Sequence, residues 1–293
     1  MRVGIVGLGR MGGAFTRNLL RRGYDLYVYD IVRSKVENFE KLGAKGASSP
    51  ADLASKVDIV LTNVPKAEDV LDVYLGANGI VHGAKPGLIA VETSTTDISS
   101  KLRVASELSS RGIKFIVAML GLTVPQAERG ETPLFVGGPE DVFRDPNVQR
   151  LFMDLSSGKI FYMGSIEAAV AFKLITNSIG FAQLVALLEG IEFISKFGVD
   201  LEKFLSAARE TAAYNYWFEA RRDKLMKEDY SAYFPIDFII KDLMYTLESA
   251  KDVACPLPMT SLAVQLYIMA SSKGYGNEDG IALRKLLKEL CKK

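Results

Sequence analysis

The stretch that decides the fold is "VGIVGLGRMGGAFTRNLLRRG", residues 3–23 of the chain. It opens on a short apolar run typical of a buried β-strand and continues with the apolar spacing of an amphipathic helix. Between the two lies a Gly-x-Gly-x-x-Gly pattern formed by Gly7, Gly9 and Gly12. A strand, a glycine-rich turn and a helix in this order predict a dinucleotide-binding βα unit.

Each glycine of this turn has its own physical reason. Gly7 permits the tight turn, Gly9 lets the diphosphate of a dinucleotide approach the backbone, and Gly12 lets the helix pack on the sheet. The helix N-terminus adds unpaired N–H groups and the positive end of the helix dipole. We therefore assign the whole turn to the cofactor site: Gly7, Leu8, Gly9, Arg10, Met11 and Gly12.

The end of the next predicted strand carries an acid, Asp30, 18 positions after Gly12. Its carboxylate can accept hydrogen bonds from both ribose hydroxyls and would repel a 2′-phosphate, which favours NAD over NADP. Arg33 lies close enough in sequence to soften that preference, so NADP remains possible. Two alternatives stay open at this point: glycines that serve packing alone, and a methyltransferase with a similar turn and acid.

The rest of the first half alternates between short apolar runs and helical patterns. The expected strands are Val3–Val6, Leu26–Tyr29, 58–61, 88–91 and 115–118, followed by a pair within 132–138 and 159–165. Such alternation predicts an α/β fold, a Rossmann-type doubly wound parallel sheet. From residue 165 onward only helical patterns occur, so we expect a dinucleotide-binding domain over 1–164 and an all-helical substrate and dimerisation domain over 165–293.

Composition narrows the function classes. Lys and Arg number 36 against 35 Asp and Glu, for a net charge of +1, which argues against a nucleic-acid platform. The two cysteines are far apart in sequence and the single histidine, His82, lies in a loop-like stretch, so we expect no metal site. We find no apolar run of membrane-spanning length and no room for a signal peptide before the first strand, and expect a cytoplasmic protein without a membrane partner.

One cation interrupts the apolar stretch "GSIEAAVAFKLITNSIGFAQLVALLEG", residues 164–190. This is Lys173, and Asn177 follows four residues later on the same helix face. A lysine on such a helix either extends its amine to the surface or serves a function that needs an apolar setting. The residues alone leave these two interpretations even.

Several segments resemble motifs of one known family, the β-hydroxyacid dehydrogenases, which includes 3-hydroxyisobutyrate dehydrogenase and, more distantly, 6-phosphogluconate dehydrogenase. In chain order they are "GLGRMGGAFTRNLLRRG", "TNVPKAEDV", "VETSTTDIS", "GSIEAAVAFKLITN", "IIKDL" and "KGYGNEDGIAL". The resemblance covers essentially the full length. It implies an NAD(P)-dependent 3-hydroxyacid dehydrogenase that forms a homodimer or tetramer.

The resemblance also implies roles for single residues. Lys173 and Asn177 match the catalytic segment and would contact the substrate. Ser94 matches a segment near the nicotinamide and would also bind substrate. The remaining cofactor residues implied in this way are Val64, Pro65, Asp69, Thr95 and Lys241, of which Lys241 belongs to a Lys–Asp pair with Asp242.

The chain departs from the family in its substrate loop, "VAMLGLTVPQAERGETP", residues 117–133. Gly121 stands where the family has a serine, and Leu122 and Thr123 stand where it has two glycines. We expect Thr123 to replace the missing hydroxyl and Leu122 to make the substrate pocket more apolar. We therefore assign Gly121, Leu122 and Thr123 to the substrate site and leave the identity of the hydroxy acid or aldehyde acid open.

The implied chemistry is hydride transfer with Lys173 as general base in oxidation and general acid in reduction. Free lysine titrates near a pKa of ~10.4, and an apolar setting would lower that value toward ~7–8. The retained lysine favours alcohol–carbonyl chemistry. The alternatives are a reductase of an unusual aldehyde acid or an imine, and a non-catalytic cofactor-binding regulatory protein.

Overall fold

The computed structural model describes residues 1–121 and 124–291 of the chain. The chain divides into two compact units, Met1–Lys173 and Leu174–Lys293. All the strands, with the helices that alternate with them, lie in the first unit. The long helix α10 (Ile166–Ser195) begins in the first unit and ends in the second.

The first unit is built on one eight-stranded sheet in the order β3-β2-β1-β4-β5-β6-β7-β8. The direction of winding reverses between β1 and β4, which is where open α/β sheets place their ligand sites. All residues of β4 and β5 are buried, as expected for central strands covered on both faces. The strands are β1 (Arg2–Val6), β2 (Asp25–Tyr29), β3 (Lys45–Gly46), β4 (Ile59–Thr62), β5 (Ile89–Glu92), β6 (Lys114–Leu120), β7 (Leu134–Gly137) and β8 (Ile160–Gly164).

One strand runs against the others, so the predicted parallel sheet is parallel in all its pairs but one. β7 pairs with β6 in antiparallel register, with Val117 opposite Gly137, while all other pairs are parallel. The helix between them, α7 (Val124–Arg129), has six residues and so a length of about 9 Å. The seven residues of β6 span about 23 Å. The helix is therefore too short to return the chain along the sheet for a parallel strand.

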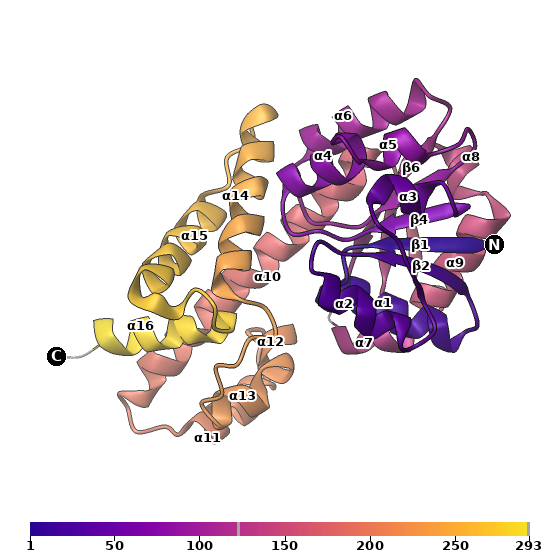
Figure 1. Ribbon diagram of the computed structural model, residues 1–293. Coiled ribbons are helices and arrows are strands. Elements are labelled where there is room, and N and C mark those ends of the chain that lie inside the picture. Colours follow the sequence, from indigo (N-terminus) through magenta and orange to yellow (C-terminus); the bar gives the residue numbers. More distant parts are fainter. Residues whose placement is uncertain (122–123, 292–293) are drawn as a thin grey trace. The chain divides into compact units, whose positions relative to one another are not determined.

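Helices cover both faces of this sheet (Figure 1). One layer contains α3, α4, α5 and α6, and the other contains α1, α7 and α9. The predicted doubly wound Rossmann-type fold is confirmed. The helices of this unit before α10 are α1 (Arg10–Arg21), α2 (Arg33–Glu40), α3 (Pro50–Ala54), α4 (Ala67–Leu75), α5 (Ile80–Gly83), α6 (Ile98–Ser109), α7 (Val124–Arg129), α8 (Glu140–Phe143) and α9 (Pro146–Ser156).

Local signals explain several helix starts. Asp97 precedes α6 and accepts a hydrogen bond from the backbone N–H of Ser100 at 2.7 Å. Asp145 caps α9 in the same way, and Pro146 stands at its first position. His82 lies in the short helix α5 with an exposed side chain, and not in a loop as expected.

The second unit is helical throughout its described residues, 174–291, apart from loops and one isolated bridge between Pro235 and Asp279. Its core gathers apolar side chains from the second half of α10 and from later helices, with Leu188 and Tyr267 fully buried. These helices are α11 (Leu201–Ala208), α12 (Tyr216–Ala220), α13 (Arg222–Met226), α14 (Ile236–Asp252), α15 (Pro258–Ala270) and α16 (Leu283–Leu290), with a π-helical turn at Ser271–Tyr275 and a 3-10 turn at Gly280–Ala282.

Helix α10 is the one helix of the described residues long and apolar enough to cross a membrane by length and composition. The sequence-based statement that no run reaches that length was therefore wrong. Buried core helices meet the same criteria, and Leu184 and Leu188 of α10 lie in the core of the second unit.

Candidate functional site

The glycine-rich turn lies at the carboxyl end of β1, and two of its glycines have no room for a side chain. Gly7 has a φ of +90°, and a Cβ there would lie 2.2 Å from the carbonyl oxygen of Asn63. A Cβ on Gly12 would lie 1.9 Å from the carbonyl oxygen of Gly7. At Gly9 the space is open, with no atom within 4 Å of a Cβ. The turn therefore leaves free the one position where a diphosphate would approach the start of α1.

Asp30 braces this turn from the end of β2. Its carboxylate accepts hydrogen bonds from the N–H groups of Leu8 and Val32, both at 2.8 Å. The Leu8 side chain is buried in the core, so Leu8 supports the turn and has no free N–H for a phosphate. Lys35 Nζ donates to both oxygens as well, at 3.4 Å and 3.3 Å, so each oxygen of the Asp30 carboxylate has two donors in this structure.

Two cations, Arg33 and Lys35, follow Asp30 closely in sequence, and both face carboxylates. Lys35 Nζ lies 3.3 Å from Asp30 Oδ2, a contact that the sequence pattern did not predict. The guanidinium of Arg33 lies 3.0 Å from Glu40 and 3.4 Å from Glu37. Arg33 is therefore paired with two acids of its own helix, which weakens the attraction between its guanidinium and a 2′-phosphate.

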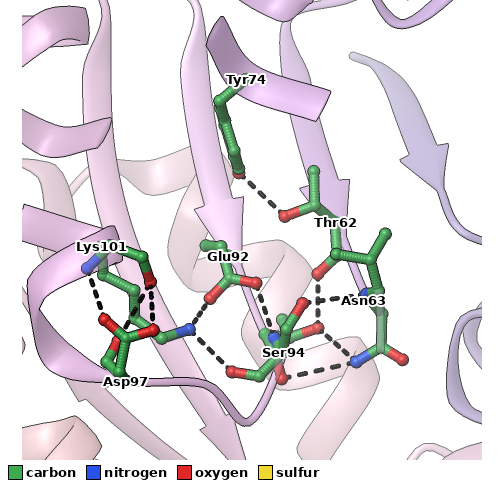
Figure 2. Close-up of polar contacts among 10 residues, drawn as sticks. Thr62, Asn63, Tyr74, Glu92, Ser94, Asp97 and Lys101 are labelled. Carbon is green, nitrogen blue, oxygen red and sulfur yellow. Dashed lines mark hydrogen bonds and ion pairs between the residues drawn. The ribbon is translucent and has the colours of Figure 1, made fainter. Parts of the chain in front are cut away.

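The loops after β4 and β5 are joined to each other by side-chain hydrogen bonds (Figure 2). The N–H of Val64 donates to Ser94 Oγ at 2.9 Å, and Asn63 Nδ2 donates to Thr93 Oγ1 at 3.0 Å. Ser94 is 1% exposed. Its hydroxyl joins the two loops beneath the surface, and its role as a substrate contact stays a prediction.

A buried tyrosine extends this network into the first unit's interior. The hydroxyls of Tyr74 and Thr62 lie 2.9 Å apart, and the carbonyl oxygen of Thr62 accepts from Thr93 Oγ1 at 2.7 Å. Burial raises the pKa of Tyr74 well above its ordinary value. The tyrosine therefore stays neutral and serves as a hydrogen-bonding group of the scaffold.

The other predicted cofactor residues of these loops occupy differing positions. Pro65 is exposed and Thr95 is half-buried, both beside the joined pair Val64 and Ser94. Asp69 accepts a hydrogen bond from the N–H of Lys66 at 3.0 Å and so caps α4. Arg10 is exposed at the first position of α1, next to the half-buried Met11.

Lys173 lies two turns into α10 and is half-buried. The start of α10 packs closely on β7, because a Cβ on Gly137 would lie 2.7 Å from Ala169 Cβ and 2.1 Å from the carbonyl oxygen of Ser165. Ala169, one turn before Lys173, is fully buried. The packing of Ser165 and Ala169 against β7 therefore fixes the position of the helix segment that carries Lys173.

Asn177, one turn after Lys173 on the same face of α10, has its amide group oriented by a buried acid. Asn177 Nδ2 donates to Asp242 Oδ2 at 2.7 Å, and Asp242 is 1% exposed. This bond fixes which end of the Asn177 amide faces the acid, with the NH2 group toward Asp242. The other carboxylate oxygen of Asp242 lies 3.2 Å from Lys241 Nζ, so the late Lys–Asp pair and Asn177 form one group.

Gly121 begins the candidate substrate loop after β6. A Cβ there would lie 3.2 Å from both Phe135 and Pro133, so a serine at this position would be crowded. The Phe135 ring packs against Phe172, with ring centroids 4.5 Å apart, and Phe172 is the neighbour of Lys173. The predicted substrate residues Leu122 and Thr123 lie outside the described residues.

Comparisons with known proteins match both parts of the chain. Residues 2–164 match the NAD-binding domain of 6-phosphogluconate dehydrogenase, and residues 168–287 match the NAD-binding family model of NADP-dependent 3-hydroxyisobutyrate dehydrogenase. The chain belongs to the β-hydroxyacid dehydrogenase family. The predicted NAD(P) cofactor class and the prediction of an NAD(P)-dependent oxidoreductase are confirmed with it.

Relatives within the family carry differing substrate names. The mitochondrial 3-hydroxyisobutyrate dehydrogenase of Mus musculus is 29% identical over 98% of this chain and 87% of its own length. The L-threonate dehydrogenase of Cupriavidus necator is 27% identical over 97% of this chain and 95% of its own length. The crystal structure of 3-hydroxyisobutyrate dehydrogenase from Salmonella typhimurium covers 98% of this chain and 99% of its own, with a TM-score of 0.87 and 26% identity.

Sequence reasoning missed several residues that support this site. Lys35 and the buried pair Glu92 and Lys101 were not among the predicted residues, although Lys101 shares the buried face of α6 with Val104 and Leu108. That periodicity was a usable signal, because a lysine three and seven residues before buried apolar positions must itself be buried or paired.

Proposed function

We propose that this protein is an NAD-preferring dehydrogenase that oxidises the hydroxyl of a 3-hydroxy acid to an aldehyde acid and catalyses the reverse reduction. The observation that supports it most strongly is the arrangement on α10: Lys173 and Asn177 share one helix face, and the Asn177 amide is oriented by its hydrogen bond to the buried Asp242. A proton-transferring amine next to an oriented hydrogen-bond acceptor is what alcohol oxidation requires of the protein.

In this proposal the residues divide into holding and reacting groups. The glycine-rich turn and Asp30 hold the dinucleotide, which supplies the hydride acceptor when bound. Lys173 removes the proton from the substrate hydroxyl in oxidation and returns it in reduction. Asn177 Oδ1 accepts a hydrogen bond from the Lys173 amine or the substrate hydroxyl and so orients the proton transfer.

A steady-state assay tests the proposal. NAD reduction is followed with a panel of 3-hydroxy acids, among them 3-hydroxyisobutyrate, and NADH oxidation with matching aldehyde acids and cyclic imines. Turnover of hydroxy acids and aldehyde acids supports the proposal. Turnover of imines alone would identify an imine reductase, and cofactor binding without turnover of any compound would identify a regulatory protein.

The substrate loop leads to a prediction about the side chain of the acid. Because Gly121 replaces a serine and lies against Phe135 and Pro133, a small polar acid has few partners there. We expect kcat/KM to be higher for larger or more apolar 3-hydroxy acids than for tartronate semialdehyde. Each additional 1.4 kcal/mol of transition-state binding free energy from apolar contacts should raise kcat/KM by about tenfold. The highest kcat/KM for the smallest, most polar compound would contradict it.

The surroundings of Asp30 lead to a prediction about the cofactor. NAD should bind more tightly than NADP, because Asp30 repels a 2′-phosphate while Arg33 is engaged by Glu37 and Glu40. Asp30→Ala should narrow the difference between the two dissociation constants, as measured by calorimetric titration. Glu107→Ala, on exposed surface of α6, is the control and should leave both constants unchanged. Equal affinity for both cofactors in the wild-type protein would rule the preference out.

A further inference from the structure

We propose that the buried ion pair between Glu92 and Lys101 is a positioning device, which fixes the Ser94–Thr95 segment for the nicotinamide end of the cofactor. The inference rests on the proposed function and concerns two residues outside the groups that hold or react with ligands. Glu92 is the last residue of β5 and Lys101 lies in the first turns of α6. Figure 2 shows both side chains directed toward the loop between these elements.

The pair binds Ser94 through the backbone on both sides. Ser94 donates its N–H to Glu92 Oε1 at 2.7 Å, and its carbonyl oxygen accepts from Lys101 Nζ at 2.7 Å. Lys101 Nζ also donates to Glu92 Oε2, which closes the ring of contacts. Since Ser94 Oγ accepts from Val64, every polar atom of Ser94 is held by a partner from another element or by Glu92.

Stability alone does not explain such a pair. Both side chains are 0% exposed, and desolvating two charges costs free energy that their attraction often fails to return. Apolar side chains of similar volume would fill the same space without that cost. What apolar residues cannot do is bind the N–H and carbonyl groups of Ser94, so the pair specifies the conformation of the loop.

The fixed loop lies beside the cofactor turn, which has a support of its own. Ser94 holds Val64, and the neighbouring Asn63 presents the carbonyl oxygen against which Gly7 is packed. A shift of the Ser94 backbone would therefore displace the Val64–Pro65 loop as well. The adenosine end has a separate support, because Asp30 holds the turn from β2 through Leu8.

Because the two ends of the cofactor have separate supports, the test compares the binding of NADH with the binding of ADP. Lys101→Met is titrated calorimetrically with NADH and with ADP, which lacks the nicotinamide nucleoside. We expect the Kd for NADH to rise about tenfold or more, since small misplacements in a site are costly, and the Kd for ADP to stay within about twofold of wild type. A rise of equal size for both ligands, or for neither, would overturn the inference.

Two further variants separate positioning from loss of stability. Leu108→Ala, in the last turn of the same helix and fully buried, is chosen to lower the Tm without touching Glu92 or Ser94, and should leave both Kd values unchanged. The double variant Glu92→Leu/Lys101→Met removes the unpaired charge and should regain Tm relative to Lys101→Met while NADH binding stays weak. Recovery of NADH affinity in the double variant would show that the pair acts only through stability.

The proposed function can fail separately. If wild-type protein bound neither NADH nor ADP, the dehydrogenase proposal itself would be wrong. If wild type bound both and Lys101→Met did the same, only the positioning inference would be lost.

Discussion

Replacing Lys173 by alanine should lower kcat by roughly 10²–10⁴-fold, the usual contribution of general acid–base catalysis. NADH affinity should barely change, because the glycine-rich turn and Asp30 are separate from α10 in sequence and belong to other elements. Lys173→Arg should recover little activity, since a guanidinium does not release its proton near neutral pH. Steady-state kinetics and calorimetric titration of the same preparations measure both effects.

The pH dependence makes this prediction more specific. The neutral amine is the base, so kcat/KM for oxidation should rise with pH in wild type, and Lys173→Ala should lose that rise. Lys196→Ala is the matched control, because Lys196 is an exposed lysine just after the end of α10. Near-wild-type turnover of folded Lys173→Ala protein would show that the lysine is a surface residue, and Lys241 would then be the next candidate.

The parts of the site that were predictable are those whose physical requirements are local. At Gly7 and Gly12 carbonyl oxygens occupy the space that a Cβ would need, so only glycine fits at these two positions. The Gly-x-Gly-x-x-Gly pattern in the sequence reports this requirement directly. Asp30 follows β2, the strand next to β1, as the sequence pattern predicted, although its bond to the Leu8 N–H was not predicted. The apolar alternation likewise sufficed for the doubly wound sheet.

The parts that were not predictable depend on partners distant in sequence or on chain reach. The antiparallel β7 follows from the shortness of α7, and helix length is among the least certain features of a sequence pattern. The hydrogen bond between Ser94 and Val64 was not predictable, because a hydroxyl near a cofactor motif looks the same in sequence whether it faces a ligand or a neighbouring loop. Glu92 and Lys101 resemble ordinary surface charges until their shared burial is known.

The contrast between Gly9 and Gly12 leads to the second large prediction. Gly9→Ala and Gly12→Ala should both raise the Kd for NADH, by about 100-fold or more, which corresponds to ~2.7 kcal/mol. The reasons differ. At Gly9 the added methyl group occupies the open space where the diphosphate must approach the backbone, whereas at Gly12 it meets the carbonyl oxygen of Gly7 at 1.9 Å and distorts the turn.

Stability should therefore separate the two variants. Gly9 has a φ of −69°, which any residue adopts, so Gly9→Ala should keep or slightly raise the Tm by restricting the unfolded chain. Gly12→Ala should lose roughly 1–3 kcal/mol of unfolding free energy, the usual cost of forcing an extra methyl group into packed structure. Thermal denaturation of the two variants and of the wild-type protein, without ligand, measures both changes in stability.

The matched control is Gly190→Ala on α10, where a Cβ would make an ordinary contact of 3.6 Å with Phe204. It should leave NADH binding unchanged. Wild-type NADH affinity in Gly9→Ala would mean that the diphosphate does not lie at the start of α1. Because Gly9 has no structural reason to be glycine in the protein without ligand, a loss of binding at unchanged Tm would assign that residue to the cofactor alone.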